Sequence, residues 1–378
     1  MLASEKIRLF PTKEQEELFW KFCNISRFTY NECLSYKIDQ YKDNNYSCKL
    51  QDLIDHIKDL KYTEDYKWIR EAPEAVTKQA IKNLMKAYDN FFRNGNKGFP
   101  KFKKKGLTRP SFYQRTDNVH MTDSTHIKLT GIKEPVRIRD HEMIYSFKNP
   151  YITYDGKYWY FSYSYELEGL EKSTSNKVVG VDLGVSRLAV TSDGIEYKNI
   201  NKTKRVKQLE KRKKRLQRQV SRKYEVNRRG TQYVKTSNIK KLEQKVRLLD
   251  RKLKNIRDNY IHNITMDLAR TKPRAIVIED LNVKGMLKNR HLSKAIQQQC
   301  FYKFREYLTY KCKFYGVKLI VADRYYPSSK RCSCCGHTKK FLSLSTRTYV
   351  CDNCNMIKDR DRNASDNLRI YGEQVLPN

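Results

Sequence analysis

Apolar residues repeat along this chain with two different periods, and the period changes from segment to segment. Near the N-terminus, Lys6 to Phe10 predicts a short strand that ends at Pro11-Thr12, and a helical pattern follows to about residue 42. A second helix is predicted from near Glu74. Its apolar stripe, at helical spacing, consists of Val76, Ala80, Leu84, Tyr88 and Phe91.

Strand-like segments replace the helical pattern from about residue 111 to residue 168. They read HIKLT, PVRIR, YITYD and KYWYFSYSY, and the last alternates at period two. These segments predict a small β-barrel associated with the helical segment. The polar stretch 169–176 (GLEKSTSN) predicts a boundary. We therefore expect an α+β multidomain protein: a unit at 1–172 with a helical insert at about 21–105, and a second unit at 173–378.

Residues 201–268 have the pattern of a long helical hairpin that turns around Asn227 to Thr231. Apolar residues of the second arm step by four and three, as in a coiled-coil seam. They are Leu242, Val246, Leu249, Leu253, Ile256 and Tyr260. The first arm has matching steps at Val206, Leu209, Leu216 and Val220. Lys213 interrupts that seam.

Three acidic residues follow apolar elements in the second half of the chain. Asp182 ends the strand predicted at Val178 to Val181, and a second strand is expected at Leu188 to Thr191. Glu279 ends the apolar strand in RAIVIED, and Asp361 opens a helix predicted to run to about Tyr371. Carboxylates at strand ends lie where open α/β sheets place their ligands. Three converging carboxylates would bind Mg²⁺, and two such ions support phosphodiester cleavage.

Each of these acids also has a purely structural explanation. Asp182 fits a turn residue, Glu279 an ion-pair partner and Asp361 a helix N-cap. Their joint occurrence, in the order strand, strand and helix, favours a common metal site over three separate coincidences.

The charge of the chain indicates its partner. Lysine and arginine number 78 against 42 aspartates and glutamates, which gives a net charge of +36. A surplus of this size indicates a large polyanion such as nucleic acid, with a generally basic, ribosomal-type protein as the alternative. A membrane surface is a weaker alternative, because no long amphipathic helix stands apart from a core pattern. The pattern contains neither a signal peptide nor an apolar run of 18 residues.

Three basic segments are candidates for nucleic-acid contact. On the predicted second helix, Lys78, Lys82 and Lys86 fall four residues apart beside Gln79. The loop Gly95 to Gly106 (GNKGFPKFKKKG) carries Lys101, Lys103 and Lys104 between phenylalanines, a composition that favours backbone binding with base stacking. The hairpin arms are mostly Lys and Arg outside the seam, and Arg212 and Arg215 represent them. The alternative for each segment is a solvated basic face.

Cysteine spacing predicts a metal site near the C-terminus. The motif Cys332-x-x-Cys335 and Cys351-x-x-Cys354 is typical of a zinc ribbon, expected at about 327–357. Cys334 is a spare thiol. Four thiolates leave no open ligand position, so we expect structural zinc. Clustered metal-type cysteines indicate a reducing compartment, and we expect a cytoplasmic protein.

With these motifs in hand, the chain resembles the TnpB family, transposon-encoded RNA-guided nucleases related to type V CRISPR effectors. The resemblance rests on GVDLG, IEDLNVKGMLKN, YPSSKRCSCCG, TYVCDNC and DRDRNASDNL in the family's order, with FPTKEQ and PKFKKKG near the N-terminus. It covers nearly the whole chain and is weakest at about 36–70. Asp361, rather than Asp359 or Asp366, matches the family's acid, because it stands two residues before Asn363.

The resemblance implies a RuvC-like, RNase H-type nuclease with a zinc-ribbon insert and an N-terminal wedge β-barrel carrying a helical recognition insert. It further implies a transposon-derived guide RNA, recognition of a short motif beside the target, and Mg²⁺-dependent cleavage of double-stranded DNA. Lys78 and Gln79 would then read the motif duplex. The alternatives are a nuclease-inactive RNA-guided repressor, a transposase and a small type V CRISPR effector. A monomer is the expected state.

Overall fold

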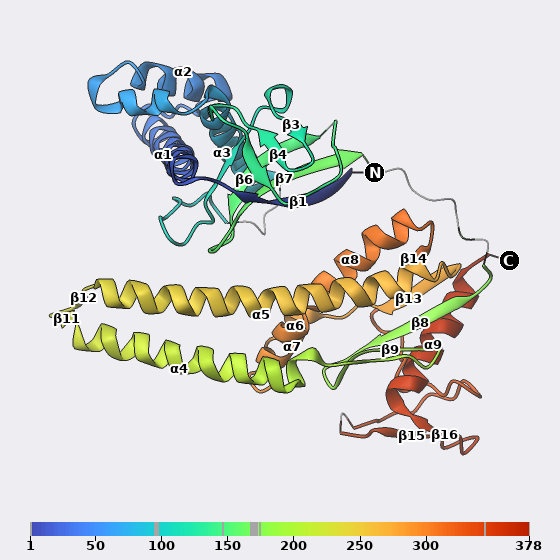
Figure 1. The fold of residues 1–378 in the computed structure, drawn as a ribbon. Helices are drawn as coiled ribbons and strands as arrows, with labels where there is room; N and C mark the ends of the chain where they lie inside the picture. Colours follow the sequence, from blue (N-terminus) through green and yellow to red (C-terminus); the bar gives the residue numbers. More distant parts are fainter. Residues whose placement is uncertain are drawn as a thin grey trace. The chain divides into compact units, whose positions relative to one another are not determined.

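A computed structural model gives the fold of the chain and describes residues 2–93, 98–145, 147–166, 173, 175–343 and 345–377. The chain divides into two compact units, Leu2–Leu167 and Glu168–Asn378, both drawn in Figure 1. The expected linker at 169–176 and the boundary at 172 lie largely outside the described residues. Among the helices described, none is both long and apolar enough to cross a lipid bilayer.

The first unit contains one antiparallel sheet of seven strands. In the order β2-β6-β7-β1-β5-β4-β3, these are Ser111–Tyr113, Lys148–Tyr154, Trp159–Glu166, Leu2–Phe10, Val136–Ile138, His126–Lys128 and His120–Asp123. Alternation on β7 buries Trp159, Phe161 and Tyr163 in the core. No pairing between β2 and β3 closes the sheet within the described residues. The expected barrel is therefore open, a half-barrel.

Four helical elements accompany this sheet: α1 (Lys13–Asn44), α2 (Leu50–Leu60), the 3₁₀ helix η1 (Glu64–Glu71) and α3 (Glu74–Arg93). Thr12 and Gln15 form a capping box that starts α1, which confirms the helix predicted directly after Pro11-Thr12. The first half of α1 packs on the sheet through Phe19 and Phe22. Its second half packs with α2 and α3 through Leu34. One helix thus joins two hydrophobic cores.

The second unit is built on a five-stranded mixed sheet in the order β10-β9-β8-β13-β14. β8 (Val178–Leu183) pairs antiparallel with β9 (Arg187–Thr191), which pairs antiparallel with β10 (Glu196–Lys198). On its other side β8 runs parallel to β13 (Ala275–Glu279), which runs parallel to β14 (Lys318–Ala322). The central strands carry apolar residues on both faces, as a sheet covered by helices on both sides requires.

The two faces of β8 and β13 pack against different helices. Val179, Val181 and Ile278 lie in the core that includes residues of α5 (Ser237–Arg270) and α8 (Phe301–Phe314). Val178 and Val277 lie in the core with α9 (Arg360–Val375), which runs against the sheet in Figure 1. Strand residues alternate between faces, so even-numbered positions of β8 and odd-numbered positions of β13 face α9.

Two glycines allow α9 to approach the sheet closely. A β-carbon added at Gly180 on β8 would lie 2.0 Å from the backbone oxygen of Ser365. A β-carbon added at Gly372 would lie 2.4 Å from a methyl carbon of Val277. Any side chain at either position would push the helix away from the strands.

α4 (Lys204–Val226) and α5 form the helical hairpin and run side by side in Figure 1. The short strands β11 (Arg228–Arg229) and β12 (Gln232–Tyr233) pair at its turn. Lys213, the residue expected to interrupt the seam, forms an ion pair with Asp250 at 2.5 Å. The seam is therefore partly polar, and the charge at this position is compensated across the two helices.

The remaining elements are short. They are the 3₁₀ helices η2 (Thr116–Asn118) and η3 (Ile200–Lys202), the helices α6 (Val283–Met286) and α7 (Ser293–Gln299), and the strands β15 (Thr348–Val350) and β16 (Ile357–Asp359). β15 and β16 pair antiparallel between the cysteine motifs and α9. This places the cysteine-rich segment as an insert between β14 and α9.

Candidate active site and metal centre

The fold directs the three predicted acids to one side of the second sheet. Val181 and Ile278 are register partners on the parallel strands β8 and β13, so Asp182 and Glu279 occupy the next register position. By parity both side chains face α9. Asp361 lies in the first turn of that helix. Two strand ends and one helix start therefore bring the acids together.

The three carboxylates influence one another electrostatically. Burial, followed by the negative charges of Glu279 and Asp361, raises the pKa of Asp182 well above its usual range. Burial also raises the pKa of Glu279, and the charge of Asp361 adds to this increase. Like charges in a poorly solvated site destabilise each other unless protons or a cation compensate them. A hard cation such as Mg²⁺, which takes oxygen ligands, fits this donor set.

The structural role considered for Asp361 belongs to a neighbouring residue. Asp359 is the N-cap of α9, and its carboxylate accepts from the backbone N–H groups of Asp361 and Arg362 at 3.0 and 3.1 Å. The Asp361 carboxylate instead accepts from the Arg187 guanidinium at 2.8 and 3.2 Å. Asp361 is thus oriented by a side chain from β9 and is not needed as a cap.

The structural roles considered for the other two acids are also filled elsewhere. Asp182 lies within β8, opposite Val190, and not in a turn. The ion pairs near the end of β13 are formed by Asp280, whose carboxylate is 2.9 Å from Arg305 and 2.5 Å from Arg324. Glu279 instead accepts a hydrogen bond from the hydroxyl of Ser328.

Asp366 does not join the acidic cluster. Its carboxylate forms an ion pair with Lys358, and the residue is nearly buried on α9. Its pairing with Lys358 compensates its charge locally.

The four predicted cysteines form a compact cluster. The Sγ atoms of Cys332, Cys335, Cys351 and Cys354 all lie within 4.8 Å of one another, and two of the pairs are 3.6 Å apart. Four sulfurs around a zinc ion at about 2.3 Å would lie about 3.8 Å apart, so the cluster fits zinc. Across the chain as described, this is the only close group of three or more such ligands. The three carboxylates are spaced more widely.

Both halves of the cluster share one backbone arrangement. The N–H of Cys332 donates to the carbonyl of His337, and the N–H of Gly336 donates to the carbonyl of Cys332. Cys351 makes the same pair of bonds with Met356 and Asn355. Gly336 and Asn355 both adopt positive φ, at 78° and 55°, which such turns require. The spare thiol of Cys334 is exposed and lies outside the cluster.

The candidate basic row on α3 is divided between two environments. Lys82 and Lys86 are exposed and line a shallow groove of about 400 Å³ with Arg93. Lys78 forms an ion pair with Glu74 at 2.8 Å. The side chain of Gln79 donates to Asn83 at 3.2 Å. Two of the four predicted side chains therefore already have partners within the protein.

The lysines of the basic loop Gly95 to Gly106 also lie in different environments. Its residues 95–97 lie outside the described part of the chain, whereas Lys101 and Lys104 are exposed. Lys103 packs with its ammonium 3.8 Å from the centre of the Tyr30 ring, and burial lowers its pKa to about 8. Both backbone groups of Lys103 bind the side-chain amide of Asn31, at 2.7 and 3.0 Å. Lys103 thus anchors the loop to α1, unlike the solvent-facing lysines beside it.

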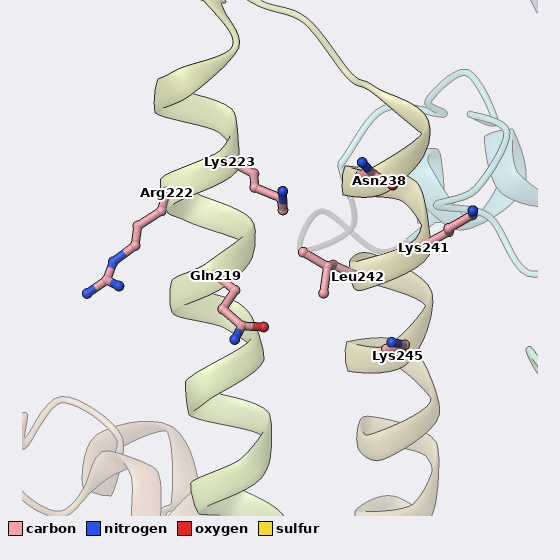
Figure 2. Close-up of a pocket in the computed structure, with 7 residues that line it drawn as sticks. All are labelled: Gln219, Arg222, Lys223, Asn238, Lys241, Leu242 and Lys245. Atoms are coloured by element: carbon pink, nitrogen blue, oxygen red, sulfur yellow. The ribbon is translucent and has the colours of Figure 1, made fainter.

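A basic groove lies near the tip of the hairpin (Figure 2). It has a volume of about 500 Å³ and is lined by Gln219, Arg222, Lys223, Asn238, Lys241, Leu242 and Lys245. Lys223 and Leu242 point into the space between the helices, whereas Arg222 points away from it. Four lining residues are cationic and none is acidic. Sequence reasoning selected Arg212 and Arg215, which are exposed on α4, and missed this groove because its residues come from both arms.

These features define a basic α/β protein of two units, with an acidic cluster and a four-cysteine cluster in the second. The family model described as "Probable transposase" matches residues 162–290, the model "Cas12f1-like, TNB domain" matches residues 301–368, and a "Helix-turn-helix domain" model matches residues 1–45. These matches confirm the resemblance to the TnpB family found in the sequence motifs.

Two full-length relatives have informative names. The chain is 28% identical over 371 residues to a Streptomyces pristinaespiralis protein named "Putative RNA-guided DNA endonuclease", covering 97% of this chain and 88% of that protein. It is 28% identical over 392 residues to an Escherichia coli (strain K12) protein named "Putative RNA-guided DNA endonuclease InsQ", covering 99% and 93%.

Solved structures share the fold at low sequence identity. A Cas12f1 chain, solved as a Cas12f1-sgRNA-target DNA complex, matches with a TM-score of 0.61 at 15% identity, covering 95% of this chain and 83% of that chain. The mini-RNA-guided endonuclease CRISPR-Cas_phi3 matches with a TM-score of 0.52 at 10% identity, covering 97% and 92%. The mixed α/β architecture is therefore shared with these effectors.

Proposed function

We propose that this protein is an RNA-guided DNA endonuclease that cuts double-stranded DNA at a RuvC-like site. The observation that carries the proposal is the convergence of Asp182, Glu279 and Asp361 on the face of the sheet that α9 covers. The strand order, with an antiparallel meander followed by two parallel strands, supports an RNase H-like core. The names of the two full-length relatives support RNA guidance and DNA cleavage.

In this proposal, the three carboxylates hold two Mg²⁺ ions. The bound ions would activate a water molecule and stabilise the leaving oxygen of the phosphodiester. The chain itself keeps the carboxylates in place: β8 and β13 fix two of them, and Arg187 orients the third. The same guanidinium also binds Asp359 at 2.6 Å and Glu196 at 2.7 Å. It therefore ties the start of α9 to the edge of the sheet.

The four-cysteine cluster would hold zinc in a structural role. Two matching turns already present the cysteine sulfurs to one point. All four ligand positions are protein thiolates, so the zinc would have no open position for substrate. Its function would be to maintain the fold of the ribbon next to the start of α9.

Guide RNA and target DNA would bind the basic surfaces. The hairpin groove, with four cations and no acid, is suited to a phosphate backbone. In the first unit, Lys82 and Lys86 present exposed ammonium groups along one groove. Lys78 and Gln79 are proposed to read the duplex motif beside the target. They would have to exchange their present partners, Glu74 and Asn83, for DNA.

The test is to purify the protein from cells that express it together with its flanking locus and to sequence the co-purifying RNA. The complex is then incubated with plasmids that carry the matching target beside a randomised flank, in Mg²⁺ or in EDTA. A discrete RNA and Mg²⁺-dependent cuts beside one flank motif are expected. Bound RNA without cutting would indicate an RNA-guided repressor. Absence of RNA would contradict the proposal.

A further inference from the structure

A buried serine contacts one of the three acids. Ser328 lies in the segment that leads from β14 into the cysteine-rich insert, and it is only 4% exposed. Its hydroxyl donates a hydrogen bond to Oε1 of Glu279. Glu279 is the last residue of β13, so its long side chain is not held by a following strand residue. One carboxylate oxygen is thereby fixed, while the other can face a cation.

Ser328 is itself held by the helix that carries Asp361. The side-chain amide of Asn367 on α9 donates to the carbonyl of Ser328 at 2.7 Å. It also donates to the carbonyl of Arg331 at 2.6 Å. Asn367 is completely buried. A buried polar side chain that satisfies two backbone carbonyls at once fixes the path of the loop between them.

A second asparagine extends this contact to the turn that carries Cys332 and Cys335. Asn363, also completely buried, donates to the carbonyl of Arg331 at 2.7 Å and accepts from the N–H of Ser333 at 2.9 Å. Arg331 and Ser333 flank Cys332, the first of the four clustered cysteines. Both asparagines therefore bind the chain within one residue of the cluster. They lie on the helix whose first turn presents Asp361.

We propose that Ser328 is a positioning residue for Glu279, and that through Asn363 and Asn367 it makes binding of the catalytic cations depend on zinc in the ribbon. This inference rests on the function proposed above. The contacts form one continuous path from Cys332, through the buried amides, to the hydroxyl on Glu279. When zinc is lost, residues 331–333 lose their fixed geometry, and the orientation of Ser328 loosens with them.

Hydrogen bonds to metal-binding side chains typically change metal affinity or activity about 10- to 100-fold when they are removed. We therefore expect Ser328→Ala to weaken cation binding by about tenfold or more while RNA binding is unchanged. Raising the Mg²⁺ concentration should restore most of the cleavage rate, because the acids themselves remain. Ser328→Thr keeps the hydroxyl and should behave like the wild type.

The experiment uses the RNA-bound protein and two readouts. Electron paramagnetic resonance of free Mn²⁺ measures how much Mn²⁺ the protein binds. It therefore reports the affinity of the cation site without catalysis. Cleavage as a function of Mg²⁺ concentration reports the shift in half-saturation. Ser365→Ala is the matched control, because Ser365 is equally buried on α9 but its hydroxyl donates to the carbonyl of Arg362 at 2.8 Å. Thermal unfolding of each variant identifies any general loss of structure.

Zinc removal tests the second half of the proposal. Stripping zinc from the wild type should weaken Mn²⁺ binding to the level of Ser328→Ala. Stripping it from Ser328→Ala should add little, because both changes act on the same path. Wild-type Mn²⁺ affinity in Ser328→Ala, failure of Ser328→Thr to restore it, or fully additive effects would overturn the inference. A wild-type complex that binds RNA but never cuts would instead count against the proposed function.

Discussion

The close packing of α9 on the sheet makes Gly180→Ala a strong test of the site geometry. The added methyl carbon would lie 2.0 Å from the backbone oxygen of Ser365 and 2.5 Å from the backbone nitrogen of Arg369. Both atoms belong to the helix backbone, so no side chain can rotate away. Ordinary contact begins near 3.4 Å, so the helix must move by about 1.4 Å, the difference between 3.4 and 2.0 Å.

This displacement predicts two measurable effects. Overpacking of this kind destabilises a protein by about 1–3 kcal/mol. For a unit of this size, each kcal/mol lowers Tm by about 2–4 °C, so a decrease of about 2–12 °C is expected. Asp361 moves with the helix relative to Asp182, and a displacement of about 1 Å in a catalytic site reduces the rate about 100-fold.

The assay is single-turnover cleavage by the RNA-bound complex at saturating Mg²⁺, together with thermal unfolding and RNA binding. RNA binding should not change, because the basic grooves lie elsewhere. Gly98→Ala is the control for the Tm alone, since a β-carbon at Gly98 has no atom within 4 Å but Gly98 lies in the candidate nucleic-acid-binding loop. If Gly180→Ala cut DNA at the wild-type rate with an unchanged Tm, the direct packing of α9 on β8 would be refuted.

Three further predictions concern the acids, a buried lysine and the hairpin. Asp182→Asn should abolish cleavage while RNA binding persists. In EDTA it should unfold at a higher temperature than the wild type, because one of three mutually repelling, half-buried carboxylates is gone; a lower Tm would contradict this reasoning. Burial lowers the pKa of Lys311 to about 8, so the unfolded chain binds more protons than the folded one between about pH 8 and pH 10.5, and the free energy of unfolding should rise with pH over that range. Lys311→Met should reduce this slope in urea titrations, and the part that remains should include the contribution of Lys103, whose pKa burial also lowers to about 8. Lys313→Met, at an exposed position on the same helix, should leave the slope unchanged. Replacing Lys241 and Lys245 together with Ala should reduce the slope of log K against log salt for RNA binding by about 2, and an unchanged slope would exclude the groove from the phosphate contacts.

Much of the second unit could be predicted from local sequence patterns. Apolar strands ending in Asp182 and Glu279 are visible in the sequence because buried strands of a covered sheet are continuously apolar. The cysteine spacing predicted the compact sulfur cluster because each Cys-x-x-Cys pair lies on one local turn. The helical hairpin was visible because its seam repeats over many turns. Each of these signals is contained in one continuous segment.

Features that depend on the pairing of distant segments were not predictable. Whether the first sheet closes depends on β2 and β3, which are close in the chain but form the two edges of the sheet because of how all the other strands pair. In the sequence, Lys103 cannot be distinguished from the lysines beside it, and only the fold shows that its ammonium group lies over the ring of Tyr30. The cationic groove of the hairpin combines residues of both arms. Ser328 is one serine in a polar stretch, and only the fold brings it to Glu279.

The structure also explains why the acids could not be separated from structural residues by sequence alone. Two of them have an acidic neighbour that fills the structural role instead. Asp359 caps α9 next to Asp361, and Asp280 forms ion pairs next to Glu279. Asp280 neutralises Arg305 and Arg324, so Glu279 does not have to, whereas Asp361 keeps one cationic partner, Arg187. Dividing these roles between adjacent residues leaves Glu279 with a neutral hydroxyl, that of Ser328, as its hydrogen-bond partner.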